Sequence, residues 1–279
     1  MAQHAACSGI SELPAKETCI ETSPIYRHKK LTENDSTVLE QIFDPESAPV
    51  AGIQIDASLP ENRFIHDSAE LQRLRSQEVR AIQMIEGLAS SSRGGQPREN
   101  AIDAATSVMS KLIAAHPTYA SAYNNRAQMR RLQHGDHVLV NPPTGTRKSE
   151  GLRDIAEAIL HDLNTAINLA TPPSPTESIS KSQALILAQA HTQRGALLHA
   201  TAKALAHSHL DPSEALATPH LFPGWGAERF EEASSRDFFL GGRYGNGIGR
   251  AMAVHTNPYA KLCGSIVQEA IKKEFRDQA

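Results

Sequence analysis

The fold is decided by the stretch Ala120-Ser-Ala-Tyr-Asn-Asn-Arg-Ala-Gln-Met-Arg-Arg-Leu-Gln-His-Gly-Asp136. Tyr123 and Ala127 lie four residues apart, so both fall on one face of a helix. The small side chain of Ala127 lets a neighbouring helix approach closely, and Gly135-Asp136 supplies turn chemistry at the end. The stretch therefore predicts a helix that packs tightly against another helix and then turns.

A second copy of this pattern is the stretch Ala190-His-Thr-Gln-Arg-Gly-Ala-Leu-Leu198. Its Arg194-Gly195 repeats Arg126-Ala127 about 68 positions later, which is twice the ~34-residue period of tetratricopeptide repeats. Both arginines fall at a position that normally faces inward. We expect each guanidinium to be satisfied by carbonyls or by a carboxylate between helices.

Apolar residues recur at helical spacing along most of the chain beyond residue 65. The pattern predicts an all-α fold of three helix hairpins joined by polar loops, an α-solenoid. A last stripe, with Tyr259, Leu262, Ile266 and Ile271, predicts a C-terminal capping helix that buries these residues against the third hairpin.

The composition agrees with a helical protein. The 279 residues include 39 alanines, and only 5% are aromatic, which disfavours a β-sandwich or barrel. A net charge of −3 without a long basic stripe disfavours nucleic-acid binding. We expect no membrane span and no signal peptide, because no apolar run is long enough. The three cysteines, Cys7, Cys19 and Cys263, suggest no disulfide framework, so the expected location is cytoplasmic.

The chain divides into three expected parts. Residues 1–31 are polar and aperiodic and are predicted to be a disordered tail, and residues 32–45 a short helix that ends before Pro45. Residues 65–279 form the helical domain, with loop insertions near 90–98, 138–151 and 207–224. Because the 138–151 insertion holds turn residues without an apolar stripe, we expect the fold to tolerate its shortening.

Three features resemble a specific family. They are Leu39-Glu-Gln-Ile-Phe-Asp-Pro45, Ala120–Arg131 and Asn257-Pro-Tyr-Ala-Lys-Leu-Cys263, and their order over about residues 36–275 closely resembles the tetratricopeptide repeat protein 36 family. The insertions and the N-terminal tail depart from it. The resemblance implies an all-helical adaptor or co-chaperone without catalytic activity or cofactor. It also implies a protein partner, either an Hsp70-class chaperone or an enzyme of tyrosine catabolism.

In such a repeat, residues three and four apart on the first helix face the concave groove. Amide side chains there can bond both the N–H and the C=O groups of an extended peptide. The alternative is a merely solvated helix face. The predicted peptide-binding residues are Ser121, Asn124, Asn125, Gln128 and Arg131 in the second repeat, and Gln189, Gln193 and His199 in the third.

Tetratricopeptide domains that hold the acidic tails of Hsp70 and Hsp90 use a clamp for two carboxylates. Asn125 matches the middle position of that clamp, but Gln189 and Gln193 are neutral where the tail needs cations. We therefore expect any Hsp70 contact to be independent of the chaperone's terminal carboxylates.

Two further motifs carry enzyme-like chemistry. The string His207-Ser-His-Leu-Asp211 offers the alternative of a metal-dependent hydrolase with His207, His209 and Asp211 as ligands. Pro212 stands where that motif wants another histidine, which favours a polar helix end. The glycine-rich stretch 241–249 lacks the spacing of a dinucleotide-binding loop, so it predicts a helix stop at Leu240-Gly241 and then a loop.

Overall fold

The computed structural model describes residues 53–89, 96–142, 151–174 and 176–257, together with positions 266, 268–269 and 273. All of them belong to the unit Val50–Ala279. The predicted tail at 1–31 and the predicted helix at 32–45 lie outside the described residues. So do Tyr259, Leu262 and Ile271.

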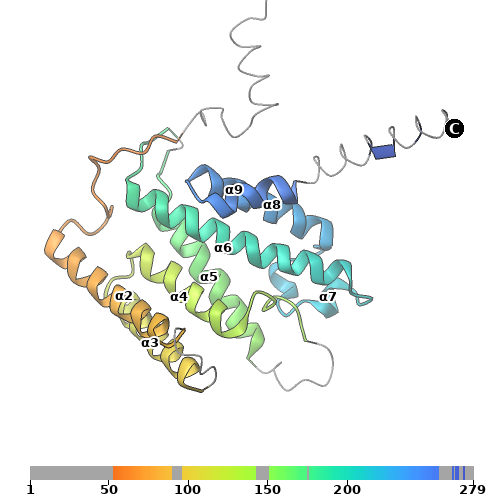
Figure 1. Cartoon of the computed structure of the whole chain (residues 1–279), viewed down its shortest axis with the longest axis horizontal. Coiled ribbons are helices and arrows are strands. Elements are labelled where there is room, and N and C mark those ends of the chain that lie inside the picture. Colours follow the sequence, from red (N-terminus) through yellow and green to blue (C-terminus); the bar gives the residue numbers. More distant parts are fainter. Residues whose placement is uncertain are drawn as a thin grey trace, which may run out of the picture. The chain divides into compact units, whose positions relative to one another are not determined.

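The described part is built from three helix hairpins (Figure 1). The first is α2 (Ser68–Ala89) with α3 (Gln96–Ala115), and the second is α4 (Ala120–His134) with α5 (Leu152–Ala170). The third is α6 (Lys181–Ala206) with α8 (Ala227–Arg243), and α9 (Gly247–Thr256) follows it. Each helix of this series packs against the next, which confirms the all-α solenoid. None of the described helices is long and apolar enough to cross a membrane.

The predicted helix stripes form two hydrophobic clusters that meet at α4. One cluster joins α2, α3 and one side of α4, where Leu74, Met109 and Met129 are buried. The other joins α4, α5, α6 and α8, and it contains Tyr123 and Ala127. The side of α4 that the sequence predicted for tight packing therefore faces the second cluster, as the small residue requires.

Ion pairs between the helices of a hairpin satisfy the two repeated arginines, as predicted. Arg126 on α4 donates two hydrogen bonds to Asp162 on α5, at 2.9 and 2.6 Å. Arg194 on α6 donates two to Asp237 on α8, both at 2.7 Å. These bidentate pairs tie the first helix of each hairpin to its second helix.

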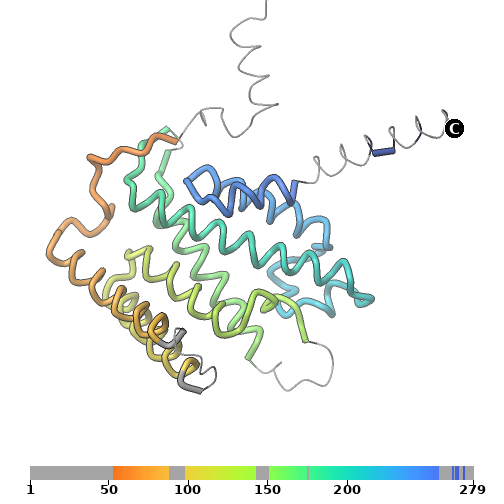
Figure 2. The backbone as a smooth tube through the Cα atoms, viewed as in Figure 1, coloured from red at the N-terminus to blue at the C-terminus, as the bar shows by residue number. Residues whose placement is uncertain are grey.

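Two insertions pack against each other and against the core. Val138 and Leu139 are fully buried beside Leu216, and Val140 forms an isolated antiparallel bridge with Leu216. Figure 2 shows the yellow-green segment after α4 next to the cyan segment after α6. The amide of Asn141 also donates to the carbonyls of Glu214 and Leu216, at 2.9 and 3.0 Å. The prediction that the 138–151 insertion is a dispensable loop is therefore wrong for its first part. Its residues 143–150 lie outside the described ones.

The glycine-rich stretch 241–249 contains the predicted helix stop and the turn into the next helix, but the helix ends later than Leu240-Gly241. Helix α8 continues to Arg243, and α9 begins at Gly247 after three intervening residues. A Cβ atom on Gly241 would lie 2.4 Å from the Thr192 hydroxyl oxygen of α6. Glycine at 241 thus lets α8 approach α6 closely.

The third hairpin is covered by α9, which packs on α8 and touches α6. The predicted capping residue Ile266 is 57% exposed, so the expectation that it is buried is wrong. The sequence stripe that begins at Tyr259 looked like the cleanest amphipathic helix. Periodicity alone cannot say which surface a helix covers, and here the residues 247–256 are in contact with α8.

Candidate protein-binding surface

The predicted peptide-binding residues lie on α4 and α6, the first helices of the second and third hairpins, and none lies on α2. Four side chains, Asn124, Arg131, Gln189 and Gln193, form a hydrogen-bonded polar seam that joins α4 to α6. The side-chain amide of Asn124 donates to Gln189 at 3.0 Å, and its oxygen accepts from Gln193 at 2.9 Å. Arg131 donates to the oxygen of the same Gln193 at 3.2 Å. The seam fixes the spacing of two neighbouring first helices, because buried amides need partners.

A buried carboxylate, Glu78, joins α2 to α4. It accepts hydrogen bonds from the hydroxyls of Tyr119 and Ser121, at 2.8 and 2.6 Å, and from the amide of Asn125 at 2.7 Å. Burial, and then the negative charge of Glu78, raise the pKa of Tyr119 above its ordinary value. Tyr119 thus stays neutral and donates its proton to the carboxylate.

Sequence reasoning missed Glu78, although a signal was present. Leu74, Glu78, Ala81 and Ile85 follow one another at spacings of three and four, and the three apolar members are buried. A carboxylate within such an apolar stripe indicates a buried acid that must find donors.

Three of the eight predicted residues do not line an open surface, so the expectation for them is wrong. Asn124 and Gln193 are buried inside the seam. His199 packs edge-on against Phe238 of α8, with ring centroids 6.3 Å apart. It follows Gln189 by ten residues, and at ~100° per residue the direction of the side chain has turned toward the other neighbour of α6.

Three of the other predicted residues, Asn125, Gln128 and Arg131, border a groove beside α4 that extends to α2, whereas Ser121 and Gln189 do not line it. Gln128 is exposed there, and Leu132 is 47% exposed beside it. Both side chains line two adjoining hollows. One has a volume of about 130 Å³ and reaches Ile82 and Glu86 of α2, and the other, of about 350 Å³, reaches Arg131 and Asp136. We call this surface the α2–α4 groove.

The groove combines an apolar centre with polar walls. Arg131 is held by Asp136 through bonds of 2.9 and 2.7 Å, and Asn125 is held by Glu78. The exposed Leu132 offers apolar contact, and Gln128 offers both a donor and acceptors. Such a surface offers apolar contact and hydrogen-bonding groups side by side.

The His207–Asp211 string ends one helix and begins another. His207 Nδ1 bonds to the carbonyl of Lys203 at 2.7 Å. Asp211 caps α7 (Pro212–Ala215) by accepting from the hydroxyl and the backbone N–H of Ser213, and these bonds lower the pKa of Asp211. Across the described ranges, no three histidine, cysteine or acidic side chains gather as metal ligands. The helix-end alternative therefore explains this string.

Comparisons with known proteins place the chain among related sequences. No protein-family model matches it, and no solved structure matches it either. The L-tyrosine degradation gene cluster protein hmgX of Aspergillus fumigatus is 40% identical over 254 residues, which are 88% of this chain and 93% of that protein. Tetratricopeptide repeat protein 36 of Xenopus tropicalis is 26% identical over 87% of this chain and 88% of its own. The Danio rerio protein of that name is 27% identical over 86% and 92%.

Proposed function

We propose that this chain, which belongs to the tetratricopeptide repeat protein 36 family together with hmgX, is a non-catalytic adaptor that holds a protein partner in tyrosine degradation. The link to tyrosine comes from the name of hmgX, which matches over nearly its whole length. The adaptor role comes from the repeat architecture, since stacked hairpins expose an extended surface suited to protein binding.

The observation that carries the proposal is the α2–α4 groove. Its central leucine, Leu132, is about half exposed, and Gln128, Glu86 and Arg131 surround it with an amide and both signs of charge. Protein interfaces commonly combine an apolar anchor with a polar rim. A partner segment that inserts one apolar side chain beside Leu132 would find hydrogen-bonding groups on either side.

The proposal is tested by replacing the anchor leucine. Affinity purification from cells that degrade tyrosine compares the unchanged protein with Leu132→Asp. A matched control is Leu210→Asp, because Leu210 is also an exposed leucine but lies far from the groove in the sequence, after α6. We expect a tyrosine-catabolic enzyme, or an Hsp70-class chaperone, to be retained by the control and lost from Leu132→Asp. Equal retention by both variants would contradict the groove as the binding surface.

If the partner is an Hsp70-class chaperone, we expect it to bind through a surface other than its acidic tail. The amide of Asn125, which would hold a tail carboxylate, already donates to Glu78. A tail carboxylate would also meet the buried negative charge of Glu78. Calorimetry with a peptide ending in Glu-Glu-Val-Asp checks this, and low-micromolar binding that Asn125→Ala abolishes would show a working clamp.

A further inference from the structure

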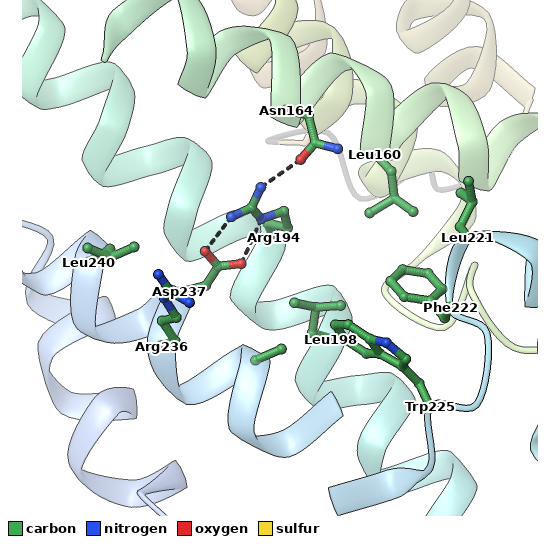
Figure 3. A pocket seen from close by; sticks show the side chains of 11 residues that line it. Leu160, Asn164, Arg194, Leu198, Leu221, Phe222, Trp225, Arg236, Asp237 and Leu240 are labelled. Atoms are coloured by element: carbon green, nitrogen blue, oxygen red, sulfur yellow. Dashed lines mark hydrogen bonds and ion pairs between the residues drawn. The ribbon is translucent and has the colours of Figure 1, made fainter. Parts of the chain in front are cut away.

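A pocket of about 440 Å³ lies away from the groove, where α5, α6 and α8 meet the segment after α7 (Figure 3). Its apolar walls come from Leu160, Leu198, Leu221, Phe222 and Trp225. Small-molecule sites have volumes of about 300–1,000 Å³ and are mostly apolar, with a few polar groups at one end. The size and lining of this pocket suit a small ligand.

The aromatic wall of the pocket is fixed by a cluster of three rings. The rings of Phe222 and Trp225 have centroids 5.1 Å apart, and both pack against the buried ring of Phe230, at 4.9 and 5.2 Å. The guanidinium of Arg229 lies 5.2 Å from the centre of the Trp225 ring. Because these contacts hold the rings in place, the pocket needs little rearrangement to receive a flat apolar group.

The opposite end of the pocket is cationic. Figure 3 shows Arg194 between Asp237 and Asn164, with a bond of 2.6 Å to Asn164 in addition to the two bonds to Asp237. A guanidinium has five N–H donors, so Arg194 keeps two beyond these three bonds. Its side chain is 26% exposed.

A second cation, Arg236, lines the same end without an ion pair to any carboxylate of the described residues. Asp237 is the one acidic residue of the lining, and it is already bound by Arg194 and by His191 at 2.8 Å. Two arginines against one carboxylate leave an uncompensated positive charge beside an apolar pocket. Such an end favours an anion, since guanidinium groups bind carboxylates strongly.

We infer that this pocket binds a small carboxylate that carries an aromatic ring, with the ring against Phe222 and Trp225 and the carboxylate at Arg236 and Arg194. The inference does not depend on the proposed α2–α4 groove, because different helices form the two surfaces. It adds a small-molecule site to a chain otherwise proposed to bind protein.

The pocket contains its own probe, because Trp225 is the single tryptophan of the chain. Titration with 3-phenylpropionate, followed by tryptophan fluorescence and by ligand-detected saturation-transfer NMR, measures occupancy directly. The uncharged 3-phenylpropionamide has the same ring and chain, and we expect it to bind about tenfold more weakly or worse, as for a lost charge-assisted bond. Equal affinity of the acid and the amide would overturn the assignment of the cationic end.

Substitutions in the pocket test whether 3-phenylpropionate binds there. Arg236→Gln should weaken 3-phenylpropionate binding about fivefold or more, while Lys203→Gln, an equal change of charge on the exposed side of α6, should leave it unchanged. Ala233→Leu should fill the pocket and abolish binding. Equal affinity of the two charge variants would refute the site. So would the absence of saturable binding by both measurements up to about 10 mM, an affinity too weak for a built site.

Discussion

The second and third hairpins share an arginine–aspartate pair, but the pair has different surroundings in each hairpin. In both hairpins, an arginine of the first helix donates two hydrogen bonds to an aspartate of the second helix. Asp162 of the second hairpin is 0% exposed and binds two arginines, Arg126 and Arg130. Asp237 of the third hairpin binds one arginine and one histidine, and its arginine borders the pocket.

The arginine at this position stabilises the hairpin in both cases, and its surroundings decide whether it can also bind a ligand. In the second hairpin, Asp162 is completely buried between Arg126 and Arg130, which are 15% and 22% exposed, so this cluster holds α4 against α5. The pair in the third hairpin lies at a solvent-accessible pocket, so its arginine retains free donors. The repeated pattern, Arg126-Ala127 and Arg194-Gly195, thus stabilises packing in both hairpins, and in the third hairpin its arginine also lines a pocket.

The largest effect is expected from removal of the sealed carboxylate. Asp162→Ala leaves Arg126 and Arg130, which are 15% and 22% exposed, without their shared carboxylate and should lower the free energy of unfolding by about 3–5 kcal/mol. Asp237→Ala should cost about 2 kcal/mol, because the partly exposed Arg194 can be hydrated from the pocket. Urea denaturation measures both, with the exposed Asp103→Ala as control. Equal losses in the free energy of unfolding for Asp162→Ala and Asp237→Ala would contradict the difference between the two hairpins.

The next largest loss of stability is expected from substitution in the two insertions that pack against each other, near 138–151 and 207–224. Leu139 is fully buried between them, so Leu139→Ala should lower the free energy of unfolding by about 3 kcal/mol through the cavity that it leaves. Leu210→Ala, at an exposed leucine of the other insertion, should change stability by under about 0.5 kcal/mol. A small effect of Leu139→Ala would restore the view that the first insertion is a dispensable loop.

A smaller effect is expected at the residue that follows each arginine. The second hairpin has Ala127 there, but the third has Gly195, where a Cβ atom would lie 3.1 Å from the ring of Phe238. Gly195→Ala should therefore cost about 1–2 kcal/mol by overpacking. The control Gly87→Ala, in α2 with no atom within 4 Å of the new Cβ, should stabilise the protein by about 0.5–1 kcal/mol. Thermal unfolding of both variants tests this, and a gain at 195 would show that the ring can move.

The smallest effect concerns pH. Burial alone would raise the pKa of Asp237, but the hydrogen bonds from Arg194 and His191 outweigh it and hold the pKa below the ordinary value. The resulting stabilisation is present above the unfolded-state pKa of about 4 and is lost as the pH falls toward the lower folded-state pKa. Denaturation between pH 5 and about pH 3 should show a shallower loss for Asp237→Asn than for the unchanged protein. Parallel curves would contradict this.

The fold could be predicted from the sequence because its determinants are local. Helical spacing of apolar residues places Leu74, Met109 and Leu163 in the core, and Arg126 and Arg194 mark the inward positions of two hairpins. The candidate surface was only partly predictable. The spacing of Asn124 and Gln193 puts them on the predicted concave face, but only the distance between α4 and α6 buries them in the seam that joins these helices.

The helices, the hairpins and the need of each repeated arginine for a partner follow from the amino-acid sequence, because helix periodicity and the chemistry of a buried guanidinium act over a few residues. Tertiary structure alone decided the rest. It chose Asp162 and Asp237 as partners across 36 and 43 positions, paired Val140 with Leu216, and assembled a pocket from residues 160 to 240. These contacts depend on how the helices cross, and no spacing along a single helix encodes that.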